Sequence, residues 1–350
     1  MDLRNSSEKK VGVIGAGSFG TVIANMLAEK NKVILFARKP EIVKEINEKG
    51  TVEGRQMHAN IEATGDQEYL ASQCQVIFPI VSSTGFREVI RSFSPFLHPY
   101  HILIHGTKGL DLAHHLEEEG QPIRVTREDI KTMSEVILEE TVVVRVGCLA
   151  GPNLAKEMAM KQPAATVIAS KYNEVILEGQ RLLRSDRFQV YGNKDLIGVE
   201  LSGVLKNIIA IAAGALSGMG LGENARALLI SRGMVETIYL GNALGGSTKS
   251  FIGLAGIGDL VATCSSNLSR NFTVGFRLAK GESLSDITAT MEETAEGINT
   301  IRIMKQLIEN SNVRAPITEN LYKVLFEGMK VEEALQYLMK YPFNVDVDFL

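Results

Sequence analysis

The feature that most constrains this chain is a cluster of glycines at the junction between a short apolar segment and a helical one. The apolar segment VGVI ends at Ile14, and helical spacing continues to Glu29. Between them lie, in order, Gly15, Ala16, Gly17, Ser18, Phe19 and Gly20. Glycine allows a tight turn there, and the N–H groups at the helix N-terminus attract a pyrophosphate. At a strand-to-helix junction the pattern predicts dinucleotide binding, with a glycine turn that holds no ligand as the alternative.

The first half of the chain alternates β-branched runs with helical stretches. The runs are VGVIGAG, VILFA, QVIFPIV, HILIHGTKG and TVVVRVGCLAGP, and ATVIAS and FQVYG continue the series. This βαβ rhythm is typical of a parallel sheet covered by helices. We therefore expect a Rossmann-type dinucleotide-binding domain over residues 1–197. The acidic segment after HILIHGTKG is expected to be an exposed excursion from this domain.

The strand rhythm stops near Ile197, and helical spacing follows. Segments such as LSGVLKNIIAIAAGAL and ENARALLISRGMVETIYLGNAL repeat apolar residues at helical intervals. The sequence thus predicts an α/β N-terminal domain followed by an all-α C-terminal domain over residues 198–350.

Composition and charge narrow the class of partner. The formal net charge of −4 leaves no basic excess for nucleic-acid phosphates, so any anionic partner is expected to be small. Three cysteines, odd in number and without metal-ligand spacing, argue against disulfides and a metal site and favour a reducing cytoplasm. The N-terminus lacks an apolar signal region, and no run of about eighteen apolar residues is expected to span a membrane.

The end of the second expected strand bears on the choice of cofactor. An NAD-preferring site usually places Asp or Glu there, where the carboxylate binds the ribose hydroxyls. Here Arg38 and Lys39 hold the position. A cationic pair suits a 2′-phosphate, so NADP(H) is expected to be accepted, with NAD(H) use left open. Two solvated basic residues on a loop are the alternative.

The segment GVLKNIIAIAAG sets Lys206 and Asn207 inside an otherwise apolar helix. A helix that is apolar on nearly every side is buried, and a buried ammonium needs a partner or a neutral form. Two structural explanations are a lysine at the helix edge that reaches solvent and an ion pair with a residue such as Glu200. The functional explanation is a proton donor or base aimed at a substrate oxygen, with Asn207 as a hydrogen-bonding neighbour.

Polar residues in GLAGIGDLVATCSSNLSRNFTVG complete a candidate pocket. Its glycines let the backbone approach a ligand, and the guanidinium fork of Arg270 matches phosphate oxygens. The remaining polar groups are Asp259, Thr263, Ser269 and Asn271. For Ser269, a helix cap is an equally strong explanation.

Eight blocks occur along the chain, from about residue 11 to residue 330, in the order GAGSFGT, TKGLD, AGPNLAKE, GVLKNIIAIAAG, GENARALLISRG, GLAGIGDL, SRNFTVG and AEGINT. Together they resemble the bacterial-type NAD(P)-dependent glycerol-3-phosphate dehydrogenases. The resemblance implies reversible hydride transfer between the nicotinamide and C2, which interconverts dihydroxyacetone phosphate and sn-glycerol 3-phosphate. It also implies a homodimer and a cellular direction toward the phospholipid precursor.

The resemblance assigns roles to individual residues. It makes Lys206 the acid/base group, with Asp259 orienting the lysine or a glycerol hydroxyl, and Asn207 and Thr263 lining the same pocket. Arg270 is expected to hold the substrate phosphate. The other expected substrate contacts are Lys108, Gly151, Asn153, Ser269 and Asn271. Beyond the glycines, the positions that match cofactor contacts are Ser18, Phe19, Arg38, Lys108, Ala155, Arg270, Thr294 and Glu296.

Two departures and two alternatives accompany this resemblance. One departure is the stretch VEGRQMHAN, which lacks the family's common aromatic-Leu-Pro. VSSTGF, from Val81, stands where the family usually has Val-Pro-Ser followed by His or Gln, at the edge of the expected nicotinamide pocket. A β-hydroxyacid dehydrogenase of the 6-phosphogluconate type also pairs a Rossmann domain with a helical domain bearing Lys and Asn, but the SRN block argues against it. A non-catalytic dinucleotide sensor would keep the glycine loop and need neither Lys206 nor the phosphate pocket.

Overall fold

The computed structural model describes residues 10–112, 125–291, 295–311 and 313–341. Contacts divide the chain into a first unit, residues 1–111 with 132–196, and a second unit, residues 112–131 with 197–350. The domains expected from the sequence are residues 1–197 and 198–350. The chief difference is that residues 112–131, expected in the first domain, group with the second unit. That segment groups with the second unit because of contacts such as the hydrogen bond from Arg127 Nε to the Leu244 carbonyl, at 2.6 Å.

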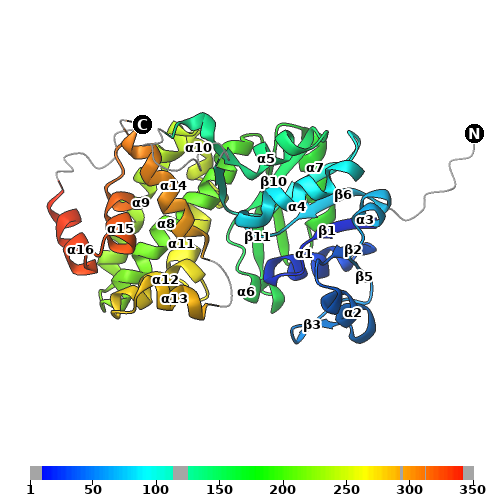
Figure 1. Cartoon of the computed structure of the whole chain (residues 1–350), viewed down its shortest axis with the longest axis horizontal. Coiled ribbons are helices and arrows are strands. Elements are labelled where there is room, and N and C mark those ends of the chain that lie inside the picture. Colours follow the sequence, from blue (N-terminus) through cyan, green and yellow to red (C-terminus); the bar gives the residue numbers. More distant parts are fainter. Residues whose placement is uncertain (1–9, 113–124, 292–294, 312, 342–350) are drawn as a thin grey trace, which may run out of the picture. The chain divides into compact units, whose positions relative to one another are not determined.

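An eight-stranded sheet forms the centre of the first unit (Figure 1). Its strands are β1 (Lys10–Ile14), β2 (Val33–Phe36), β5 (Ile61–Thr64), β6 (Cys74–Pro79), β7 (Ile102–His105), β10 (Arg145–Ala150), β11 (Ala164–Ser170) and β12 (Phe188–Asn193). In space they follow the order β12-β11-β10-β7-β6-β1-β2-β5. The helices of this unit are α1 (Ser18–Ala28), α2 (Pro40–Lys49), α3 (Gln67–Gln73), α4 (Phe86–Phe93), α5 (Met133–Glu140), α6 (Ala155–Ala159) and α7 (Asn173–Leu183). A separate short hairpin pairs β3 (Thr51–Val52) with β4 (Arg55–Gln56).

Most neighbouring strands of the sheet run parallel, as the βαβ rhythm predicts. Strand β1 is parallel to β2 and β6, and β7 is parallel to β6 and β10. The expectation is wrong at one edge, where β11 runs antiparallel to β10 and β12 follows the direction of β11. The connection from β10 to β11 contains only the five-residue helix α6. After this connection the chain returns beside β10 in the opposite direction.

Alternate residues of the central strands enter opposite cores. On β1, Val13 packs in the cluster that contains Leu27 of α1, whereas Ile14 packs in the cluster that contains Phe86 and Phe93 of α4. Successive side chains of a strand point to opposite faces, so a strand buried on both sides is a continuous apolar run. The runs VGVI and VILF are apolar throughout because both faces of these strands are buried. Polar and glycine residues follow where the strands end.

The second unit is helical after residue 197, as predicted. Its described helices are α8 (Leu196–Gly218), α9 (Glu223–Ala243), α10 (Thr248–Phe251), the π-helical turn η5 (Leu254–Gly258), α11 (Asp259–Cys264), α12 (Arg270–Ala279), α13 (Leu284–Thr290), α14 (Glu296–Glu309), α15 (Pro316–Phe326) and α16 (Val331–Lys340). A Cβ at Gly214 would collide with the Phe272 carbonyl, and a Cβ at Gly275 with the Ile211 carbonyl. Glycine therefore lets the backbones of α8 and α12 touch.

Helix α8 corrects one expectation. It is the one helix in the described part of the chain that is long and apolar enough to cross a membrane, with a mean hydropathy of 1.7 in its most apolar window. However, 94% of that window is buried within the protein. A helix that is apolar on all sides and buried in this way is typical of a core helix, so its composition is weak evidence for a span.

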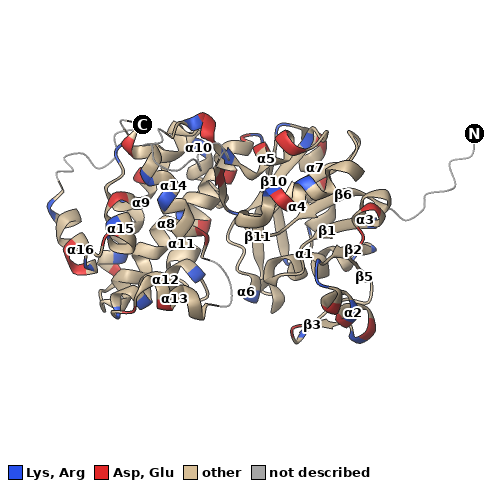
Figure 2. Ribbon diagram, viewed as in Figure 1, with Lys and Arg blue, Asp and Glu red and all other residues tan. Residues whose placement is uncertain are grey.

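Charged residues of both signs are mixed along the chain (Figure 2). Helix α2 is an example, with Glu41, Glu45 and Glu48 close in sequence to Lys44 and Lys49. This mixing agrees with the formal net charge of −4.

The chain passes from one unit to the other at residues 111/112, 131/132 and 196/197. Strands β8 (Leu110–Leu112) and β9 (Ile130–Thr132) form a two-stranded sheet that contains the first two passages. The third passage lies at the start of α8.

Candidate active site

The glycine cluster lies at the carboxyl end of β1, where the chain turns into α1. Gly15 has a φ of 115°, which side chains rarely allow, and its N–H donates to the Phe36 carbonyl at 3.0 Å. A Cβ at Gly20 would collide with the Gly15 carbonyl, so glycine is required for the close turn. A Cβ at Gly17 would meet no described atom within 4 Å. The Cβ side of Gly17, the N-cap residue of α1, therefore borders open space, and a pyrophosphate bound at this helix N-terminus stays a prediction.

Ser18 and Phe19 begin helix α1 beside the end of β7. A Cβ at Gly106 would lie 3.0 Å from a ring carbon of Phe19, so glycine lets the ring approach this backbone. The Thr21 hydroxyl donates to the Gly17 and Ser18 carbonyls, both at 3.0 Å. Ser18 and Phe19 are thus held at the glycine turn, and their contacts with the cofactor stay a prediction.

Arg38 follows β2 at the same edge of the sheet. Strands β1 and β2 pair in parallel with Ile14 opposite Phe36, so the residues just beyond the two strands are neighbours. Arg38 is exposed, and Lys39 is the N-cap residue of α2. The fold thus places Arg38 just beyond the carboxyl end of β2, and its contact with a 2′-phosphate stays a prediction.

Lys108 and Gly151 come together beyond the ends of β7 and β10. These strands pair in parallel, with His105 opposite Cys148. Lys108 is half-buried, and its Nζ donates to the Gly151 carbonyl at 3.1 Å. The TKG and GPN blocks, distant in sequence, are therefore neighbours in the first unit.

Asn153 uses its amide within the fold. Its Nδ2 donates to the Ala165 carbonyl at 3.0 Å, and its Oδ1 accepts from the Thr166 hydroxyl at 2.8 Å. These bonds hold the turn after β10 against β11, and Ala155 then begins α6. The substrate contact of Asn153 stays a prediction.

Lys206 lies on a buried face of α8 and forms an ion pair. The residue is 6% exposed, and its Nζ lies 2.6 Å from Asp259 Oδ1 and also donates to Thr263 Oγ1. Asp259 and Thr263 are 2% and 4% exposed. They are four residues apart on α11, so they share one side of that helix. The ion-pair explanation holds, with Asp259 as a counter-ion, and the low exposure contradicts a lysine that reaches solvent.

Asp259 follows directly on the π-helical turn η5. The Ser202 hydroxyl of α8 donates to the Ala255 carbonyl at 3.1 Å. A Cβ at Gly256 would collide with the Phe251 carbonyl, so the turn requires glycine there. Such π-helical turns are rare and frequently lie at functional sites. The GLAGIGD block thus shapes the backbone that directs Asp259 at Lys206.

The LKN, SRN and AEG blocks meet inside the second unit. Asn271 Oδ1 accepts a hydrogen bond from the Gly297 N–H at 2.9 Å. A Cβ at Gly297 would lie 2.9 Å from the Asn207 carbonyl oxygen. Asn271 therefore satisfies the N-terminus of α14, whose N-cap residue Ala295 has no polar side chain. Glu296, half-buried, is the first residue of the same helix.

Ser269 and Arg270 begin helix α12. Ser269 Oγ accepts from the Phe272 N–H at 3.3 Å, which is the helix-cap role considered from the sequence. Arg270 is the exposed first residue of the helix. A guanidinium at a helix N-terminus combines two sources of positive potential for a phosphate. Thr294, a further expected cofactor contact, lies outside the described residues.

Cys264, the last residue of α11, is unsuited to nucleophilic catalysis. Burial raises the pKa of its thiol to about 12; Lys206 lowers the pKa and Asp259 raises it, both to a smaller extent. Because the thiolate is the nucleophilic form, this thiol stays unreactive near neutral pH.

The open helix N-terminus on a doubly wound sheet and the buried lysine in a helical unit define a class, the nucleotide-dependent dehydrogenases of two domains. Family models described as NAD-dependent glycerol-3-phosphate dehydrogenase N-terminus and C-terminus match residues 10–176 and 195–336. The chain belongs to the NAD(P)-dependent glycerol-3-phosphate dehydrogenase family.

Individual relatives match along nearly the whole chain. A Pseudomonas aeruginosa glycerol-3-phosphate dehydrogenase [NAD(P)+] is 37% identical over 350 residues, covering 99% of this chain and 98% of the relative. The enzyme of that name from Geobacter metallireducens is 39% identical, with 95% and 97% covered. A crystal structure of a Coxiella burnetii glycerol-3-phosphate dehydrogenase has a TM-score of 0.85 at 32% identity, with 95% and 99% covered. The predicted fold, the family resemblance and an NAD(P)-dependent oxidoreductase are thereby confirmed.

Arg87 is a buried charge that its sequence context does not reveal. It is 8% exposed, although arginine is almost never buried without partners. Its hydrogen-bond partners include carboxylates 24 and 53 residues away, so no local motif marks it. The sequence offers one local sign of this burial: Arg87 directly follows Phe86, the first residue of the buried face of α4.

Proposed function

We propose that this chain reduces dihydroxyacetone phosphate to sn-glycerol 3-phosphate, and catalyses the reverse oxidation, with NADP(H) or NAD(H). The observation that carries the proposal is the buried pair of Lys206 and Asp259, in a chain of this family. The bound nicotinamide supplies or accepts the hydride at C2 of the substrate. The residues of the chain must then move one proton at the C2 oxygen.

Lys206 is the group that moves this proton. In the reductive direction Nζ gives a proton to the carbonyl oxygen, which becomes the hydroxyl oxygen of the product. Asp259 Oδ1, at 2.6 Å, stabilises the ammonium before transfer and orients it, together with the Thr263 oxygen. The low exposure of all three side chains supports this role, because water competes little for the same hydrogen bonds.

Arg270 holds the substrate phosphate. Its exposed position at the N-terminus of α12 supports this assignment. Ser269 and Asn271 use side-chain oxygens to cap α12 and α14, so they contribute by fixing the backbone around Arg270. Further substrate contacts come from Asn207 in the second unit and from the neighbouring Lys108, Gly151 and Asn153 in the first.

The cofactor is held mainly by the first unit. Backbone N–H groups at Gly17 and Ser18 bind the pyrophosphate, supported by the open space at the glycine turn. Arg38 binds a 2′-phosphate when NADP(H) is the cofactor. Further contacts come from Phe19, Lys108, Ala155, Arg270, Thr294 and Glu296.

We further infer the cellular setting. Cys74, Cys148 and Cys264 are buried and are not joined by disulfides, which supports a reducing compartment and hence the cytoplasm. Residues 1–197 act as the cofactor domain and residues 198–350 as the substrate domain of a homodimer. The product serves as a precursor of glycerophospholipids.

A spectrophotometric assay with NADPH tests this function. Addition of dihydroxyacetone phosphate is expected to oxidise NADPH, whereas dihydroxyacetone without the phosphate is expected to react far more slowly. Tight NADPH binding without turnover would contradict the proposal and indicate a dinucleotide sensor.

A further inference from the structure

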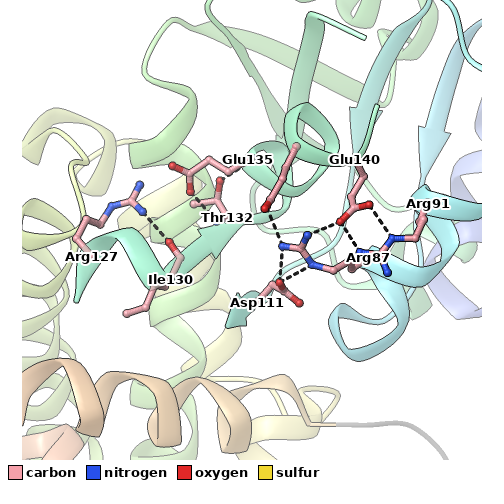
Figure 3. A network of polar contacts seen from close by, with 9 residues as sticks. Arg87, Arg91, Asp111, Arg127, Ile130, Thr132, Glu135 and Glu140 are labelled. Carbon is pink, nitrogen blue, oxygen red and sulfur yellow. Dashed lines mark hydrogen bonds and ion pairs between the residues drawn. The ribbon is translucent and has the colours of Figure 1, made fainter. Parts of the chain in front are cut away.

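Arg87 joins separate segments of the first unit through carboxylates (Figure 3). It is the second residue of α4, and its side chain is 9% exposed. Its Nε donates to Asp111 Oδ2 at 2.9 Å, its Nη2 donates to Glu139 Oε2 at 3.0 Å, and its Nη1 donates to Glu140. Arg91 also donates to Glu140, through Nε at 2.8 Å. All three nitrogens of the Arg87 guanidinium are thus engaged.

The pairing of Arg87 is tight because most of its partners are buried. Burial lowers the pKa of Arg87, but hydrogen bonds to the three carboxylates outweigh it, so the pKa rises above its usual value. The side chains of Asp111 and Glu140 are 17% and 11% exposed, whereas that of Glu139 is 50% exposed. Water therefore screens the bond to Glu139 most, and the guanidinium is held chiefly by Asp111 and Glu140.

Asp111 fixes one end of the loop that carries Lys108. The other end is fixed by Thr107, whose hydroxyl donates to the Val81 carbonyl at 2.7 Å. The Gly106 N–H also donates to the Pro79 carbonyl, at 3.0 Å. The start of the loop is thus attached to the chain before α4, and its end is attached to α4 itself through Arg87.

We propose that Arg87 is a positioning residue for Lys108. By holding Asp111, Arg87 sets the backbone of residues 106–111, and this backbone keeps Lys108 Nζ at 3.1 Å from the Gly151 carbonyl. The inference rests on the proposed function, in which Lys108 contacts substrate and cofactor. Arg87 acts only through this loop and touches no reacting atom.

The first test compares Asp111→Ala with Glu139→Ala. Each variant removes one carboxylate from Arg87, but only Asp111→Ala removes the side-chain link between the loop and α4, while the pairing of β8 with β9 stays in both variants. We expect Asp111→Ala to lower kcat/KM for dihydroxyacetone phosphate by about ten- to a hundredfold, because a small displacement of a binding group has effects of this size. Glu139→Ala is expected to stay within about twofold of wild type. Equal losses in the two variants would overturn the proposal, since general weakening of the ion cluster would explain both.

A double substitution tests whether the effect passes through Lys108. In a Lys108→Met background, Asp111→Ala is expected to cause less than about a twofold further loss, because the side chain that it positions is already absent. If the two losses multiply in full, Asp111 acts independently of Lys108 and the proposal is wrong.

Hydrogen exchange supplies a readout that does not need activity. The amides of residues 106–110 are expected to exchange faster in Asp111→Ala than in wild type or Glu139→Ala. Unchanged protection would overturn the positioning role, whereas faster exchange in a chain that never reduces dihydroxyacetone phosphate would contradict only the proposed function. If Asp111→Ala does not fold, Asp111→Asn, which keeps the size and removes the charge, replaces it in every comparison.

Discussion

At the scale of single residues, the ion pair of Lys206 keeps a buried charge electrically balanced. An unpaired ammonium at 6% exposure would be strongly destabilising. The Asp259 carboxylate at 2.6 Å compensates its charge. Thr263 accepts from Lys206 and donates to the Asp259 backbone carbonyl at 2.6 Å, so the cluster has a fixed geometry. A rigid donor of this kind suits proton transfer to a positioned substrate oxygen.

Arg38 carries the prediction about cofactor choice. A charge-assisted hydrogen bond contributes about 1.5 to 3 kcal/mol. We therefore expect Arg38→Ala to reduce the preference for NADPH over NADH by about ten- to a hundredfold, measured as the ratio of kcat/KM values at one ionic strength. Lys39→Ala, next to it at the start of α2, is the matched control and should have a smaller effect. An unchanged ratio in Arg38→Ala would show that Arg38 is only a solvated loop residue.

Arg270 carries the prediction about the substrate phosphate. A lysine keeps the charge but cannot reproduce the two parallel hydrogen bonds of a guanidinium. Arg270→Lys is expected to raise the KM for dihydroxyacetone phosphate by about tenfold or more, while NADPH binding changes less. With an unchanged KM, the phosphate would have to bind elsewhere, such as at Lys108.

At the scale of elements, helix α15 is capped by a side chain from α9. The N-cap residue of α15, Ala315, has no side-chain oxygen. Glu236, 4% exposed, accepts instead from the N–H groups of Ile317 and Thr318, at 2.7 and 2.8 Å. The Thr318 hydroxyl also donates to it, at 2.6 Å. One carboxylate thus satisfies donors that the start of a helix leaves without partners.

This cap predicts a pH dependence of stability. Burial raises the pKa of Glu236 and its hydrogen bonds lower it; burial has the larger effect, so the pKa rises from 4.5 to about 7. Because the folded pKa exceeds the unfolded one, the stability linked to its protonation is fully present below about pH 4.5 and is lost as the pH rises through about 7. Over this range the free energy of unfolding of wild type should fall by up to about 3 kcal/mol relative to Glu236→Gln. Urea titrations measure this difference, and parallel curves for the two proteins would refute the prediction.

Strand β11 shows which properties of an element the sequence predicts and which it does not. The apolar run ATVIAS predicts this strand, but its reversed direction is defined only by its pairing with β10. The π-helical turn before Asp259 likewise has no characteristic spacing of apolar residues in the sequence. Tertiary contacts define it, such as the hydrogen bond from the Ser202 hydroxyl to the Ala255 carbonyl.

At the scale of the whole molecule, the expected groups are divided between the two units. The glycine turn, Arg38 and Lys108 lie in the first unit, and Lys206 and Arg270 lie in the second. In the proposed reaction, hydride transfer thus depends on one unit and proton transfer on the other.

The two-part fold and the candidate role of Lys206 can be predicted because short stretches of sequence mark them. The glycine cluster follows a strand, and Lys206 interrupts an apolar helix. Arg87 and Glu236 have no such signal, since Arg87 pairs with Glu140 53 residues away and Glu236 accepts from Ile317 81 residues away. The grouping of residues 112–131 with the second unit depends in the same way on distant contacts, such as that of Arg127 with Leu244.

The turnover of Lys206→Met tests the central claim most directly, with cofactor binding measured on the same protein. Methionine keeps an unbranched side chain without the ammonium, and Lys249→Met, at an exposed lysine of the same unit, is the control. We predict that kcat for dihydroxyacetone phosphate falls by about 10² to 10⁴-fold in Lys206→Met, while its NADPH Kd and the kcat of the control stay near wild type. A Lys206→Met protein that keeps near-wild-type kcat would contradict the account, because another group would then have to transfer the proton.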